Sequence, residues 1–298
     1  MRAVSLHGDV IVVTSRLLHA NCTIIRGAFA ATDAAGMAAG DEVAEGAPGP
    51  LHVIPPGAPG APPAAETLIL DSPILPDELE LLPSLLAQAG FPAPSGLLAT
   101  HADWDHVLAP LAFPGTPLGC AESSAARLAA EPGAAQRSLR DFDEGLYISR
   151  ERPLALGAPQ ALPVPGRLGV GDLELELHVA EGHTGEGMAV WVPWAGVLAP
   201  GDYLSTIEIP LLGTGGAVEA YLDTLERLRP LVQRAEHVVP GHGPIIGAAR
   251  ALEVLEEDLV YLRALRHDGA GAELPAGRRS REQRRLHAAN VAALRPPT

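Results

Sequence analysis

The order of the apolar segments constrains the fold of this 298-residue chain most strongly, because strands followed by helices occur twice along it. β-branched runs predict strands, and apolar residues at helical spacing predict helices. In the first block, strands are expected at 10–18, 21–29, 67–73 and 95–100, and helices at 75–90 and 122–146, the latter broken near Pro132 and Gly133. The first two strands are expected to pair as a hairpin.

A second block repeats this order. Strict alternation in "LELELHV" within 166–184 and the apolar run in 188–202 predict strands, and helices are expected at 217–232 and 248–267. Two such blocks are typical of two β-sheets packed face to face with helices on the outside. We therefore expect an α/β (α+β) fold, a four-layer αββα sandwich, in one domain spanning residues 1–298.

Two segments fall outside this pattern. Residues 30–65 are dominated by Ala, Gly and Pro and are expected to form a flexible surface insertion. Residues 268–298 form a basic C-terminal tail, whose helical stretch at 278–295 would cap the body or remain solvated. A solvated or capping helix is favoured over a nucleic-acid-binding patch.

Composition narrows the class of protein and its partners. The net charge of -15 disfavours binding to nucleic-acid phosphates. Two cysteines are too few for a disulfide framework or a cysteine-based zinc module. No stretch approaches the roughly 20 apolar residues that span a bilayer, and the N-terminus lacks the pattern of a secretory signal. We expect a cytoplasmic protein with a small-molecule substrate and without nucleic acid or membrane as a partner; a homo-oligomer stays open.

A cluster of polar residues directly follows one of the predicted strands. The stretch "LLATHADWDHVLAP", residues 97–110, is either a solvated loop or half of a metal site. It contains His101, Asp103, Asp105 and His106. Three later residues of metal-ligand type also follow predicted strands and lie beside glycines: His183, Asp202 and His242. Four strand ends that each offer such residues predict one shared metal site.

These motifs, H-x-D-x-D-H, G-H-T-G, G-D and P-G-H-G, resemble those of the metallo-β-lactamase superfamily. The usual pattern there is H-x-H-x-D-H followed by His, Asp and His, and the resemblance extends from about residue 10 to residue 265. It implies two divalent metal ions, with zinc favoured. By position, His101 and His183 would hold the first ion, Asp105, His106 and His242 the second, and Asp202 would bridge them.

Asp103 departs from the family pattern, because it stands where the family has its second histidine for the first metal. As a ligand, Asp103 would make the first site richer in oxygen and shift its preference toward iron or manganese. The alternatives are a carboxylate that supports other ligands, a surface residue, or a first site that is weak or vacant.

The resemblance implies a metal-dependent hydrolase that uses metal-activated water on a small ester, thioester, lactone or related substrate. Asp202 would bridge or orient, and Asp105 would ligate and accept a proton, so both count as catalytic. Trp104 and Tyr203 are candidates for substrate binding, with core packing as the alternative for each. Two other functions stay open: a non-haem iron redox protein or oxygenase on the same fold, and a non-catalytic metal-binding protein.

Overall fold

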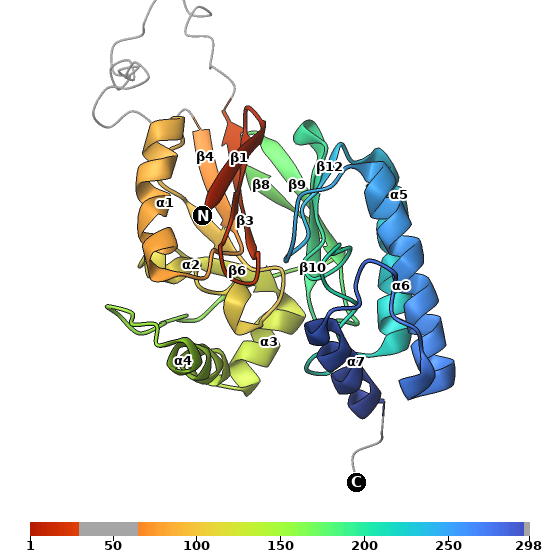
Figure 1. Ribbon diagram of the computed structural model, residues 1–298. Helices are drawn as coiled ribbons and strands as arrows, with labels where there is room; N and C mark the ends of the chain where they lie inside the picture. The colour runs from red at the N-terminus through yellow and green to blue at the C-terminus, as the bar shows by residue number, and fades with distance from the viewer. Residues whose placement is uncertain (30–64, 295–298) are drawn as a thin grey trace, which may run out of the picture.

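The computed structural model describes residues 1–29 and 65–294, which form two β-sheets between two layers of helices (Figure 1). The predicted α/β four-layer sandwich is thereby confirmed. In the described residues, the first sheet contains, in spatial order, β1 (Arg2–His7), β2 (Val10–Thr14), β3 (Asn21–Ala28), β4 (Ala65–Leu70), β5 (Gly96–Leu98), β6 (Leu118–Ala121) and β7 (Gln160–Leu162). Its strands are antiparallel from β1 to β4 and parallel from β4 to β7.

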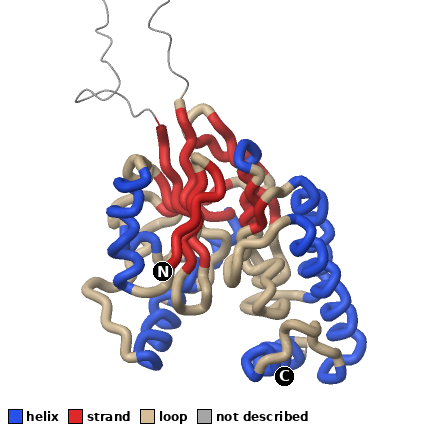
Figure 2. Tube along the Cα trace, turned by 45° about the horizontal axis from the view of Figure 1, so that its top comes forward, coloured by secondary structure: helices blue, strands red, loops and turns tan. Residues whose placement is uncertain are grey.

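The second sheet lies face to face with the first. Its spatial order in the described part of the chain is β12 (His237–Val238), β11 (Val197–Ala199), β10 (Met188–Val192), β9 (Leu173–Val179) and β8 (Gly166–Val170). Only the β11–β12 pair among these is parallel. Figure 2 shows the strands enclosed by helices on both sides.

Helices cover the outer face of each sheet. The first sheet is covered by α1 (Pro76–Ala89), α3 (Glu122–Ala130) and α4 (Ala134–Leu146), with the short α2 (Ala109–Ala112) beside them. The second is covered by α5 (Val218–Arg234) and α6 (Ala248–Asp268), and α7 (Arg281–Ala293) ends the described chain. The break expected near Pro132 and Gly133 is confirmed, because α3 ends at Ala130 and α4 begins at Ala134.

Three apolar cores fill the three spaces between these layers. Strand β2 contributes to two of them because successive side chains of a strand point to opposite faces. Val10 and Val12 belong to the core between the sheets, whereas Ile11 and Val13 belong to the core beneath α1 and α4. A third core joins β10 and β11 to α5 and α6. Burial on both faces explains why β2 appears as a continuous β-branched run.

The two atypical segments differ in what the structure describes. The predicted flexible insertion lies outside the described residues over 30–64, and Ala65 already belongs to β4. The basic tail is described as far as residue 294 and contains α7. Arg278 from this tail is buried, so the tail places one positive charge inside the protein. Within residues 1–29 and 65–294, no helix has both the length and the apolar character needed to cross a membrane.

Candidate metal centre

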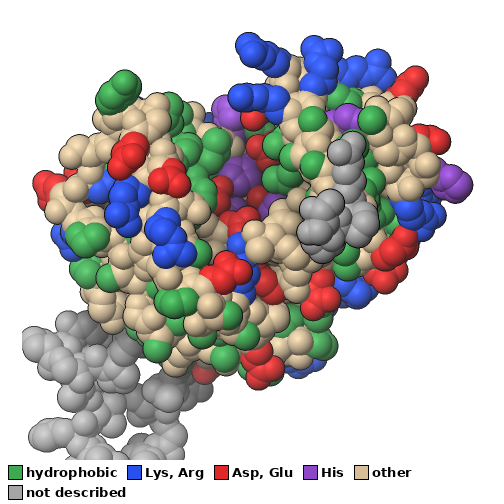
Figure 3. All heavy atoms as spheres, turned by 90° about the horizontal axis from the view of Figure 1, so that it is seen from below, with side chains coloured by type: hydrophobic (Ala, Val, Ile, Leu, Met, Phe, Trp, Pro, Cys, Tyr) green, Lys and Arg blue, Asp and Glu red, His purple; other side chains and the backbone are tan. Residues whose placement is uncertain are grey.

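Four loops converge at one edge of the sandwich, each just after a strand. They follow β5, β9, β11 and β12 and contain all seven predicted ligands: His101, Asp103, Asp105, His106, His183, Asp202 and His242. Figure 3 shows histidine side chains gathered in a hollow of this face, with acidic side chains around them. The predicted shared site is therefore assembled geometrically from segments far apart in the sequence.

The seven side chains form three overlapping groups whose ligand atoms lie within 4.8 Å of one another. The groups are His101, Asp103 and His183; Asp105, His106 and His242; and His101, His106 and Asp202. The first two correspond to the two metal sites implied by the sequence. The Nε2 atoms of His101, His106 and His183 are buried and have no hydrogen-bond partner among the described residues. Buried polar atoms normally have partners, so this donor set fits divalent metal ions.

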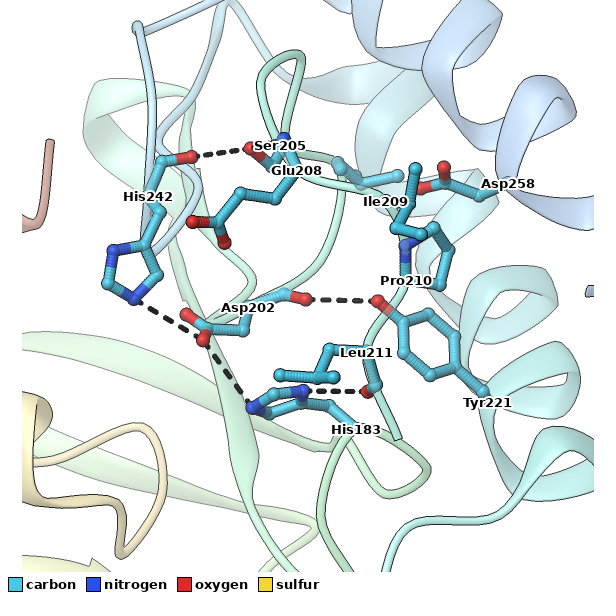
Figure 4. A pocket seen from close by; sticks show the side chains of 11 residues that line it. His183, Asp202, Ser205, Glu208, Ile209, Pro210, Leu211, Tyr221, His242 and Asp258 are labelled. Carbon is cyan, nitrogen blue, oxygen red and sulfur yellow. Dashed lines mark hydrogen bonds and ion pairs between the residues drawn. The ribbon is translucent and has the colours of Figure 1, made fainter. Parts of the chain in front are cut away.

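Asp202 lies at the centre of the arrangement (Figure 4). Its carboxylate oxygens lie 3.2 Å from His106 Nε2 and 3.4 Å from both His183 Nε2 and His242 Nε2. The neighbouring backbone at Gly241 approaches so closely that a Cβ there would overlap Asp202 Oδ1. A glycine is therefore required beside the carboxylate that touches both ligand groups.

Backbone carbonyls orient two of the histidines. His183 Nδ1 lies 2.9 Å from the carbonyl oxygen of Leu211, and His242 Nδ1 lies 3.0 Å from that of Leu18. A carbonyl oxygen only accepts, so each Nδ1 carries the proton. This tautomer leaves Nε2 of both rings free to bind a metal ion.

Asp71 orients the other two histidines and was missed by the sequence analysis. Its carboxylate accepts from the Thr100 backbone N–H at 2.8 Å and the Thr100 hydroxyl at 3.0 Å, and lies 3.1 Å from His106 Nδ1. Because the Thr100 hydroxyl donates to Asp71, it accepts from His101 Nδ1, 3.1 Å away. The stretch "LILDSP" carried the missed signal, since Asp71 also follows a buried strand.

The carboxylates set the charge of the histidines. Burial alone would lower the pKa of His242, but Asp202 and Asp105 outweigh it and raise that pKa well above its usual value. Asp202 likewise raises the pKa of His106 against the effect of burial. The pKa of His101 is instead lowered, by burial and then by His106. A divalent ion would compete with protons for His242, His106 and His183, whose pKa values are all raised.

A pocket lies beside the ligands and is lined by the loop that follows Asp202 (Figure 4). The Glu208 carboxylate projects into it, and burial raises the pKa of Glu208. Tyr203 is buried behind the site, where its hydroxyl accepts from the His183 backbone N–H at 3.0 Å. The Trp104 ring packs 4.5 Å from that of Phe142, between centroids. Substrate binding by Tyr203 and Trp104 stays a prediction.

The C-terminal segment holds this pocket loop, a role that the sequence analysis missed. The Gln283 side-chain oxygen accepts from the Ile209 N–H at 2.7 Å. The Asn290 amide accepts from the Leu212 N–H at 2.8 Å and donates to the Pro210 carbonyl at 2.7 Å. Consequently, α7 fixes the backbone on both sides of Leu211, whose carbonyl orients His183.

Comparison with solved structures identifies relatives of the same fold. A metallo-beta-lactamase from Pontibacter korlensis is 15% identical, with a TM-score of 0.54 over 86% of this chain and 98% of that one. A metallo-beta-lactamase family protein from Thermus thermophilus is 22% identical, with a TM-score of 0.57 over 89% and 85%. The stereoselective inverting sec-alkylsulfatase of Pseudomonas sp. is 14% identical, with a TM-score of 0.63 over 98% of this chain. This chain spans only 49% of that sulfatase.

Sequence comparison gives the family. No curated protein matches the chain by sequence. The family described as "Metallo-beta-lactamase superfamily" matches residues 77–242, more than half of the 298 residues. This match includes the motif loop and has His242 at its end. With the two-sheet fold of its structural relatives, it shows that the chain belongs to the metallo-β-lactamase superfamily.

Proposed function

We propose that this protein is a dinuclear metal-dependent hydrolase. One observation carries the proposal: the two ligand groups both lie against Asp202, with His106 3.2 Å and His183 3.4 Å from its oxygens. Divalent ions, zinc above all, would supply activated water and polarise the bond to be broken. His101, Asp103 and His183 would hold one ion, Asp105, His106 and His242 the other, and Asp202 would bridge them.

The side chains themselves have separate proposed roles. Asp202, which contacts both ligand groups, would hold them at a fixed separation. Asp105 Oδ2 lies 3.3 Å from His242 Nε2, which suits a ligand, and the second oxygen of Asp105 would accept a proton. Leu211 and Leu18, through their carbonyls, would keep the ligand nitrogens aimed at the ions. Asp105 and Asp202 are therefore the proposed catalytic residues.

The proposed substrate is a small ester, thioester, lactone or related molecule, turned over in the cytoplasm. The pocket beside the ligands is small and lined by carboxylates, including Glu208 and Asp202. The net charge of -15 disfavours nucleic acid and other polyanions as substrates. The relatives include proteins named as a β-lactamase and a sec-alkylsulfatase, so β-lactams and alkyl sulfates belong in the substrate panel.

Asp103 supports a second candidate function, a non-haem iron redox protein or oxygenase. Asp103 Oδ2 lies 3.7 Å from Nε2 of both His101 and His183. Two histidines with one carboxylate are the ligand set typical of non-haem Fe(II) oxygenases. Asp103 completes such a set with His101 and His183, and the second group, Asp105, His106 and His242, has the same donor composition.

Metal content tests the proposal. Wild-type protein expressed without added metal and analysed by elemental mass spectrometry should contain two zinc ions per chain and hydrolyse members of the panel. Asp202→Asn should lose metal affinity by more than about 100-fold, because it removes the negative charge and one of the two oxygens of the proposed bridging ligand, which costs more than loss of a supporting partner. The matched control is Asp141→Asn, an exposed position on α4, which should bind metal as the wild type does.

The other outcomes are equally informative. Iron with oxygen consumption and no hydrolysis would replace the hydrolase by the redox function. Wild-type protein that binds no divalent metal, or Asp202→Asn protein that binds it normally, would overturn the dinuclear proposal.

A further inference from the structure

An arginine from helix α3 contacts the residue that departs from the family pattern. Arg127 Nη2 lies 2.7 Å from Asp103 Oδ1. The other oxygen, Oδ2, lies 3.7 Å from Nε2 of both His101 and His183. Asp103 therefore has one oxygen for the arginine and one for the first ligand group.

Glu186 holds this arginine in place. Arg127 Nη1 lies 2.8 Å from Glu186 Oε1, so the guanidinium bridges two carboxylates. Glu186 is buried and also accepts from the backbone N–H of Ala102, 3.1 Å away, and from the Ser124 hydroxyl. Glu186 thus ties α3 to the motif loop immediately before Asp103. An arginine fork suits this task, because its donors have a fixed planar geometry.

The charge balance explains why such a contact belongs here. A histidine at position 103 would be a neutral ligand that binds through a single atom. An aspartate adds a negative charge and a second oxygen able to chelate the same ion. Arg127 returns a positive charge and occupies Oδ1, so that only Oδ2 faces the first ligand group.

We propose that Arg127, anchored by Glu186, is a positioning residue that makes Asp103 act as a single-atom, charge-compensated substitute for histidine in the first metal site. The inference rests on the proposed metal centre. It assigns a function in metal binding to residues outside the ligand motifs, in "ESSAARLAA" and "GHTGEG".

A double-mutant cycle on metal affinity tests it. Zinc binding is measured by competition with a chromophoric chelator. Binding at the first site is identified as the binding step that is lost in His183→Ala. Arg127→Gln should weaken that step by about 10- to 100-fold, as loss of a partner that orients a ligand does. In an Asp103→His background, Arg127→Gln should leave the step unchanged, because a guanidinium only donates and cannot orient a histidine through its Nδ1–H.

Two further measurements separate positioning from folding. The absorption spectrum of the cobalt-substituted protein should change in Arg127→Gln, because Asp103 is free to bind through both oxygens. Arg127→Lys, which keeps the charge without the fork, should recover only part of the affinity. Arg140→Gln, an exposed arginine on α4, is the matched control and should behave as the wild type.

The failures are distinguishable. An equal loss in the wild-type and Asp103→His backgrounds, an unchanged wild-type step or full recovery by Arg127→Lys would overturn the role of Arg127 and leave the metal centre standing. Absence of zinc binding in the wild type would overturn the proposed function itself.

Discussion

The two halves of the molecule each bury one charged residue behind a loop that orients a metal-site histidine, but the charges are opposite. In the N-terminal half, the Glu78 carboxylate accepts from the Ser15 hydroxyl at 2.5 Å and the Arg16 backbone N–H at 2.9 Å. In the C-terminal half, the Arg278 guanidinium donates to the carbonyls of Ser205 at 3.1 Å and Glu208 at 2.8 Å.

The difference follows the backbone group that each charge contacts. Glu78 accepts from an N–H of the turn at 15–20, whereas Arg278 donates to two carbonyls of the loop at 205–212. The N–H groups of Ile209 and Leu212 in that loop have uncharged acceptors on α7. Each loop then offers a carbonyl to a histidine, Leu18 to His242 and Leu211 to His183. A buried charge can therefore shape a site from a distance when it satisfies the backbone groups of the supporting loop.

Removing the buried guanidinium should have the largest effect. Arg278→Met leaves Asp258, 2.6 Å from Arg278 and buried, without its ion pair, and leaves two carbonyls without donors. Breaking a buried pair in this way costs about 3–5 kcal/mol of unfolding free energy. Urea unfolding measures it, with the exposed Arg279→Met as control, expected within about 0.5 kcal/mol of wild type. Equal stability of the two variants would mean that the buried Arg278 does not stabilise the C-terminal half of the molecule.

Neutralising the buried carboxylate should have a smaller effect that depends on pH. Glu78→Gln weakens several hydrogen bonds to one side chain, so we expect a loss of about 2 kcal/mol at neutral pH. Burial alone would raise the pKa of Glu78, but hydrogen bonds from Ser15, Arg16 and Leu75 outweigh it and lower that pKa.

The lowered pKa gives the sign of the pH dependence. The stability contributed by Glu78 is present above its unfolded pKa of about 4.3 and is lost as pH falls through the lower folded value. The difference between wild type and Glu78→Gln should therefore shrink on acidification below about pH 4. The exposed Glu80→Gln is the control on the same helix. A difference that grows in acid would contradict the role given to the carboxylate.

The smallest effect is expected from an uncharged contact. Gln283→Ala removes the acceptor for the Ile209 N–H and should cost about 1 kcal/mol. Hydrogen exchange at the Ile209 amide should accelerate more than exchange at the amides of β10. Arg284→Ala, exposed on the same helix, controls for helix propensity. Unchanged exchange at Ile209 would mean that α7 does not hold the pocket loop.

The proposed ligands could be predicted from sequence because all seven lie in loops that directly follow strands, four of them after β5. His183 follows an alternating strand and Asp202 follows an apolar one, and a neighbouring glycine marks each position locally. The same local rule applies to Asp71, which directly follows β4 and was nevertheless missed. The layers were predictable for a similar reason, because strand and helix periodicities extend over short windows.

The supporting contacts were not predictable in this way. Arg127 and Glu186 lie 59 residues apart in the sequence, and neither belongs to a periodic pattern that indicates the contact. Arg278 lies in the basic tail, which was expected to cap the body or remain solvated, and its burial depends on a partner on α6. Such partners are determined by tertiary packing, which short windows do not contain.

The contact between Ala20 and His242 has a consequence for when the proposed metal centre can form. Ala20 pairs with His242 as an isolated bridge, and the Asn21 side chain donates to the carbonyls of Pro240 and Gly243. These pairings close loops of more than two hundred residues, and contacts so distant in sequence slow folding. When only the first half of the chain has been synthesised, four of the seven proposed ligands are present and the other three are not. At the proposed metal centre, capture of an ion would therefore be a late event, because the loops that carry His183, Asp202 and His242 come later in the chain.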